Sequence, residues 1–179
     1  AAGDATPTAH RRALVRRGAV PVDAVRGGVR MTLAAVRDRG DVAVREANER
    51  VGGGRPDGTL VLGRSEFVAA RDALDPRIRQ ALEQAIANVA RFAATQRPIA
   101  STTTVVANGI EIERRWEPLR SVGCYVPGGS APYPSSLVMT VVPARVAGVE
   151  RVVVASPASS DGSTDPVLLG AAGLLEVDA

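Results

Sequence analysis

Two short apolar runs on either side of an apolar, helix-like segment constrain this chain more than any other feature. The runs are RSVGCYV, from Arg120, and RVVVASP, from Arg151, and they begin about 30 residues apart. The segment between them, SSLVMTVVPARVAGV, has the length and apolarity of a helix. This spacing predicts a βαβ unit with parallel strands. The second run shows no alternation of polar and apolar residues, which is typical of a strand buried on both faces.

The ends of the crossover helix are also indicated by the sequence. We expect Ser135 to cap its start and Gly148 to end it. Pro143 lies inside the segment and is expected either to kink the helix or to mark a break in it. Another helix is predicted in DPVLLGAAGLL, after the second strand. The C-terminal third therefore reads as the opening of a parallel α/β sheet.

The N-terminal part of the chain is predicted to be helical. Apolar residues at helical spacing indicate one helix from Pro21 to about Val36. Gly40 is expected to end this helix, and Asp41 to cap a second helix over 42–51.

Two further helices precede a hairpin. Ser65 is expected to cap a short helix, and Asp75 to cap a long helix that Pro98 ends. We expect the whole apolar stripe of the long helix to be buried. Its members are Ile78, Leu82, Ile86, Val89 and Phe92.

The run TTTVVANGIEIERRW predicts a β-hairpin. Two β-rich runs flank Asn108-Gly109, a preferred two-residue turn. Together these elements predict an α/β protein in which N-terminal helices and a hairpin lead into a parallel βαβ unit.

The basic residues bear on possible partners. All 22 are arginines, and Arg is well suited to gripping phosphate. They are spread beside Asp and Glu, as in RDALDPRIRQALEQ, and the net charge is only +3, so we expect no nucleic-acid binding. No apolar run reaches the ~18 residues of a membrane span, and no secretory signal is visible. The single cysteine, Cys124, excludes an internal disulfide and fits a reducing cytoplasm.

The turn after the first strand of the βαβ unit, YVPGGSAPYPSS, is the candidate binding site. Ligands of open α/β sheets bind at the carboxyl ends of the strands. Gly128 and Gly129 allow positive φ and close approach of a ligand to the backbone. The helix N-terminus near Ser135 can receive an anion.

Tyrosines flank the same turn. Tyr125 and Tyr133 are the only two in the chain, and a tyrosine there can pack against a flat ring and donate a hydrogen bond. The alternative is a turn that needs glycine only for its geometry, with tyrosines that fill gaps. The spacing does not match the G-x-G-x-x-G fingerprint, so the residues alone leave both interpretations open.

The tract VGCYVPGG, followed by YPSSLVM, PARVAGV and a Val-rich strand ending in Ser-Pro, resembles the histidinol dehydrogenase family. The preceding TTTVVANGIEIERRWEPLRSVG also resembles the hairpin region of that family. The resemblance is clear over 75–179 and weaker over 20–74. It implies a homodimeric enzyme dependent on zinc and NAD that oxidises L-histidinol to L-histidine through an aldehyde, using two NAD+. It also implies an incomplete Rossmann-like fold, related to aldehyde dehydrogenases.

The resemblance assigns roles to particular residues. The tyrosine of YVPGG binds the dinucleotide in that family, which implies this role for Tyr125, with Gly128 and Gly129 beside it. The family's zinc ligands and catalytic Glu-His pair lie downstream of Ala179, so we expect no catalytic and no metal-binding residue in this chain. We therefore expect a truncated unit that makes no NADH from histidinol and binds no zinc by itself. His10, the only histidine, is expected to be exposed.

The expected organisation has three parts. They are a loosely ordered segment over 1–20, the helices and hairpin of a first core domain over 21–118, and the start of a dinucleotide-binding domain over 119–179.

Cys124 stands where the family commonly carries an aliphatic residue. One hypothesis is a thiol nucleophile that forms a thiohemiacetal, which would need a base nearby. No histidine is near in sequence, and cysteine often behaves as a small buried hydrophobe, so packing is favoured. Two other functions stay open from the sequence: a related dehydrogenase of another small alcohol, such as a sulfopropanediol, and a non-catalytic nucleotide-binding or interaction module.

Overall fold

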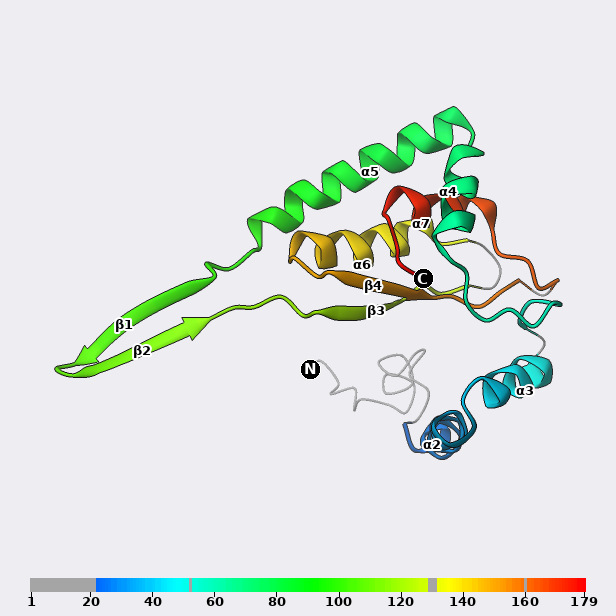
Figure 1. Cartoon of the computed structure of the whole chain (residues 1–179), viewed down its shortest axis with the longest axis horizontal. Coiled ribbons are helices and arrows are strands. Elements are labelled where there is room, and N and C mark those ends of the chain that lie inside the picture. The colour runs from blue at the N-terminus through cyan, green and yellow to red at the C-terminus, as the bar shows by residue number, and fades with distance from the viewer. Residues whose placement is uncertain (1–21, 52, 129–131, 160) are drawn as a thin grey trace, which may run out of the picture. The chain divides into compact units, whose positions relative to one another are not determined.

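The computed structural model describes residues 22–51, 53–128, 132–159 and 161–179 (Figure 1). The chain divides into two compact units, Ala1–Ala47 and Asn48–Ala179, which are described separately. The segment predicted to be loosely ordered, with His10, lies outside the described residues.

The first unit contains helix α2, Val22–Arg39, and most of helix α3, Asp41–Val51. Gly40 separates the two helices with a φ of 55°, a conformation that favours glycine, so the predicted helix end is confirmed. Asp41 is not a cap, because it is already the first helical residue, and the Gly40 carbonyl accepts from the N–H of Ala43 at 3.1 Å. The apolar face of α2, which includes Val29 and Leu33, is exposed.

The second unit begins with helix α4, Arg64–Asp72. The predicted cap at Ser65 is wrong, because the N-cap is Gly63, two residues earlier, and Ser65 is already inside the helix. The Gly63 N–H donates to the Glu66 carboxylate at 2.6 Å. A glutamate three residues into the helix thus satisfies the donor in front of it.

Helix α5, Pro76–Thr95, begins as predicted, with Asp75 accepting from the Arg77 N–H at 2.8 Å. The prediction of a fully buried stripe is only partly right. Leu82 is buried, and Ile86 and Val89 pack against the core, but Ile78 and Phe92 are 39% and 65% exposed. Ala93, directly after Phe92, is only 6% exposed, so α5 is still covered at this point, and its core-facing side passes through Ala93 and not through Phe92.

The predicted hairpin is confirmed. Strand β1, Ser101–Ala107, pairs antiparallel with β2, Ile110–Arg115, and Ala107 faces Ile110 across the Asn108-Gly109 turn. Gly109 has a φ of 82°. Nearly all residues of both strands are exposed on both faces.

The βαβ unit is also confirmed, and with it the α/β class. Strand β3, Ser121–Tyr125, lies parallel to β4, Arg151–Ala155, and helix α6, Pro134–Val146, connects them. Helix α7, Pro166–Leu174, follows β4.

The boundaries of α6 differ from the prediction at one end only. Ser135 is not the cap, because Tyr133 holds the N-cap position and Pro134 is the first helical residue, where its missing N–H costs nothing. Gly148 ends the helix with a φ of 89°, as predicted. The helix continues through Pro143, so it is not broken there.

One face of the β3–β4 sheet carries the core. Helices α6 and α7 lie on the same side of the two strands (Figure 1), and Cys124, Val126 and Val152 are buried beneath them. The prediction that β4 is buried on both faces is wrong, because Val153 is only half-buried and Ala155 is exposed. Among the described residues, helices cover only one face, so alternate side chains of both strands remain open.

Two glycines of α7 let it lie directly on α4 and on the residues that follow α4. A Cβ on Gly173 would overlap the carbonyl oxygen of Phe67, and one on Gly170 would lie 2.6 Å from Leu74 Cδ2. Because the two helices approach so closely, Phe67 is sealed into the core between them and the sheet.

The last described residues run along the free edge of β4. The Asp178 N–H donates to the Val152 carbonyl at 3.0 Å, and the Asp178 carboxylate accepts from the Val152 N–H at 2.8 Å. The same carboxylate meets Arg145 and Arg64, each at 3.1 Å. The hydrogen bond from the Val152 N–H, together with the two guanidinium groups, lowers the pKa of Asp178.

We expect this depressed pKa to appear as acid sensitivity. A carboxylate whose folded pKa is below its unfolded value of about 3.9 stabilises the fold above about pH 4, and this stabilisation is lost as the pH falls through the folded pKa. Wild-type chain should therefore be more stable to urea than Asp178→Asn at pH 7, and the difference should shrink toward pH 3. Glu111→Gln, at an exposed position of β2, is the control. A difference that does not change with pH would contradict the prediction.

Candidate functional site

Tyr125 lies at the predicted place, as the last residue of β3 and opposite Ala155 of β4. Its neighbours Cys124 and Val126 are buried, whereas its own side chain is 66% exposed. Because side chains of a strand alternate between faces, the Tyr125 ring lies on the uncovered face of the sheet. The ring and its hydroxyl are therefore available to a ligand.

Gly128 is required for close packing against Pro157 and not for an unusual backbone conformation. Its φ is not in the left-handed region, so the expected positive φ is not found there. Instead a Cβ on Gly128 would lie 2.7 Å from Cγ and 3.1 Å from the carbonyl oxygen of Pro157. Gly129 lies outside the described residues, and the close approach of a ligand to this pair stays a prediction.

The loop after β4 is a part of this region that sequence reasoning missed. Gly162 in this loop has a φ of 77°, and a Cβ there would lie 2.5 Å from Pro56 Cδ and 2.7 Å from the Gly54 carbonyl oxygen. The loop between β4 and α7 thus contacts the β3 loop through Pro157 and residues 54–56 through Gly162. The sequence feature that could have indicated this loop is the Ser-Pro pair, Ser156-Pro157, at the carboxyl end of the second predicted strand.

The two helix N-termini at this edge differ. The first amides of α7 are satisfied by Asp165, which accepts from Val167 at 2.8 Å and Leu168 at 3.0 Å. Helix α6 has no cap from the side chain of its N-cap residue, and among the described residues it is the backbone carbonyl of Tyr133 that accepts there, from the Ser136 N–H at 3.0 Å. A negative charge is therefore already present at the start of α7 and not at the start of α6, where the helix dipole favours an anion.

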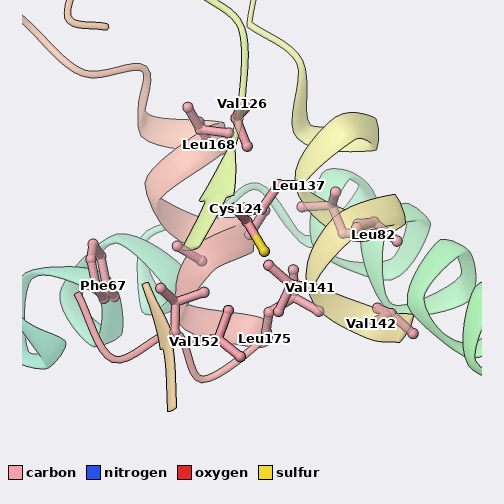
Figure 2. Close-up of a cluster of buried hydrophobic side chains, with 14 of the residues drawn as sticks. Phe67, Leu82, Cys124, Val126, Leu137, Val141, Val142, Val152, Leu168 and Leu175 are labelled. Carbon is pink, nitrogen blue, oxygen red and sulfur yellow. The ribbon is translucent and has the colours of Figure 1, made fainter. Parts of the chain in front are cut away.

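Cys124 lies on the core face of β3, one residue before Tyr125. Figure 2 shows its sulfur among the side chains of Leu137 and Val141, and the residue is only 8% exposed. A nucleophile must reach its substrate, so this position supports the packing role.

We expect Cys124→Ala to leave turnover of the full-length protein within about twofold, because loss of a true nucleophile costs roughly a millionfold. In the native protein the thiol should react slowly with a disulfide reagent, and quickly in denaturant. A collapse of kcat with unchanged folding would contradict this expectation.

The described residues do not fit a metal. In the part of the chain that the structure describes, no group of three or more His, Cys, Asp or Glu side chains is placed to hold an ion. Within that same part, no helix is long and apolar enough to cross a bilayer.

The fold and the β3 loop define an α/β protein with an open βαβ unit. Among the solved structures with a similar fold is the crystal structure of histidinol dehydrogenase from Elizabethkingia anophelis, with a TM-score of 0.78 over 97% of this chain and 40% of that one. The sequence identity is 22%, so this likeness supports the fold.

Comparison of the sequence with known proteins identifies the family to which the chain belongs. The histidinol dehydrogenase family pattern matches residues 15–179. The chain is 47% identical to the histidinol dehydrogenase of Nocardia farcinica over 98% of its own length, and 41% identical to that of Methanothermobacter thermautotrophicus over 90%. The chain belongs to the histidinol dehydrogenase family. It spans about 40% of the length of the curated relatives that it matches.

Proposed function

We propose that this chain is part of an NAD-dependent histidinol dehydrogenase, which oxidises L-histidinol to L-histidine through the aldehyde and reduces two NAD+. The observation that carries the proposal is the 47% identity to a curated histidinol dehydrogenase over nearly the whole chain. The full-length protein is then expected to be a cytoplasmic homodimer, as the family resemblance implies.

Within that enzyme, we assign residues 119–179 to the start of a Rossmann-like domain that binds the dinucleotide. Tyr125 is the proposed contact, and the segment through Gly128 and Gly129 lies beside the cofactor. The exposure of Tyr125 at the carboxyl end of β3 and the uncapped start of α6 support this assignment. Zinc and the catalytic bases would be held by parts of the enzyme outside this chain, as the family resemblance implies.

The test is an assay of the full-length protein. With L-histidinol and NAD+, we expect two NADH for each histidinol consumed, and loss of activity on treatment with a chelator. The same preparation is then offered a sulfonated propanediol in place of histidinol. Preferred oxidation of that alcohol would replace the proposed substrate, and NAD+ binding without turnover of either alcohol would favour a non-catalytic module.

A further inference from the structure

Pro157 packs against the backbone of Gly128, where only a residue without a Cβ leaves room for the proline ring. Both loops in this contact leave the same end of the sheet, because β3 and β4 are parallel. A Cβ at Gly128 would come within 2.7 Å of the Pro157 ring, a separation that real Cβ atoms essentially never show. The pyrrolidine ring is rigid and cannot swing aside as a long side chain would. The contact therefore sets how closely the two loops can approach each other.

The segment from Tyr125 to Gly128 is thus anchored at two points. The first anchor is Val126, whose N–H donates to the Ala155 carbonyl at 2.9 Å and whose side chain is fully buried. The second anchor is Gly128 against Pro157. Tyr125 directly precedes the first anchor, so its exposed ring is attached to a backbone that β4 and the following loop hold in place.

The loop that carries Pro157 is supported from its other side. Gly162 packs against Pro56 and the Gly54 carbonyl, again at distances that exclude a side chain. The loop between β4 and α7 therefore makes two tight contacts, Pro157 against Gly128 and Gly162 against residues 54–56.

We propose that Pro157 is a positioning residue for NAD+ binding, which acts by setting the backbone from Tyr125 to Gly128. The proposal rests on the proposed function, in which this segment contacts the dinucleotide. Pro157 itself touches the loop and need not touch the cofactor. Its loss should therefore change the apparent affinity for NAD+ more than the affinity for the alcohol substrate.

The experiment measures kcat and both KM values in the full-length enzyme for Gly128→Ala, Pro157→Ala and the double variant. Gly128→Ala should raise the KM for NAD+ about fivefold, because overpacking shifts the backbone. Pro157→Ala should raise it about twofold, because the ring no longer holds the loop. The double variant should have a lower KM for NAD+ than Gly128→Ala alone, because the new methyl group no longer meets the ring carbons. If the two substitutions acted independently, their effects on this KM would multiply instead. The KM for histidinol should not change.

Gly27→Ala is the matched control, because a Cβ there meets nothing within 4 Å. If Gly128→Ala does not fold, Pro157→Ala alone tests the proposal, because its KM for NAD+ should rise while its KM for histidinol should not. The positioning role is overturned if Pro157→Ala leaves the KM for NAD+ unchanged, or if the double variant has a KM for NAD+ as high as that of Gly128→Ala. Either result leaves the proposed function intact as long as the wild type depends on NAD+. A wild type with no NAD+ dependence overturns the proposed function as well.

Discussion

Leu82→Ala is expected to lower the free energy of unfolding of the chain by about 2–5 kcal/mol. Leu82 is 8% exposed and belongs to the core cluster that joins α5 to α6, β3 and α7. Figure 2 shows it near Leu137 and Val142 of α6. Truncation removes buried carbon atoms and leaves a cavity that rigid helices fill only partly.

Phe92→Ala provides the comparison on the same helix. Phe92 is 65% exposed, so its loss should change the free energy of unfolding by no more than about 0.5 kcal/mol. Urea unfolding of the chain, followed by circular dichroism, measures both. Equal costs for the two variants would show that the apolar stripe of α5 is buried along its whole length.

Tyr125→Ala in the full-length enzyme should raise the KM for NAD+ by roughly twofold to tenfold and leave the KM for histidinol nearly unchanged. An aromatic contact is worth about 0.5–1.5 kcal/mol beyond the area it buries, and 1.4 kcal/mol is a factor of ten. Stability should change little, because the ring is 66% exposed. Steady-state kinetics with each substrate varied in turn provide the measurement.

Tyr125→Phe separates the ring from its hydroxyl. A phenylalanine that restores the wild-type KM would assign the contact to stacking, whereas one that resembles alanine would assign it to the hydrogen bond. If Tyr125→Ala keeps the wild-type dependence on NAD+, the tyrosine is not a cofactor contact and the loop is only a turn.

Local signals in the sequence predicted the elements well. The Asn108-Gly109 turn, the Asp75 cap and the ends of helices at Gly40 and Gly148 depend on neighbours within a few residues, so the sequence carries them directly. Ser135 and Ser65 failed as caps because each had a competitor beside it, Pro134 and Glu66, that moved the helix start.

Contacts between residues far apart in the chain were harder to predict from the sequence. The exposure of Ile78 and Phe92 depends on which side of α5 faces the core, and that of Val153 on which face of the sheet the helices cover. For the candidate site, the position of Tyr125 followed from the strand pattern, but its cofactor role came from the family resemblance. The contact of Gly128 with Pro157 joins two loops separated by a whole helix, and no spacing rule indicates it.

The close packing of α7 on α4 has a consequence for how this protein is made. The two helices start at Arg64 and Pro166, about 100 residues apart in the chain. At a synthesis rate of roughly 5–20 residues per second, α7 leaves the ribosome about 5–20 s after α4. During that interval Phe67 has no helix to cover it, because its partner surface at Gly170 and Gly173 has not been translated. Until α7 is synthesised, Phe67 therefore stays uncovered by this helix, and the core cannot form completely.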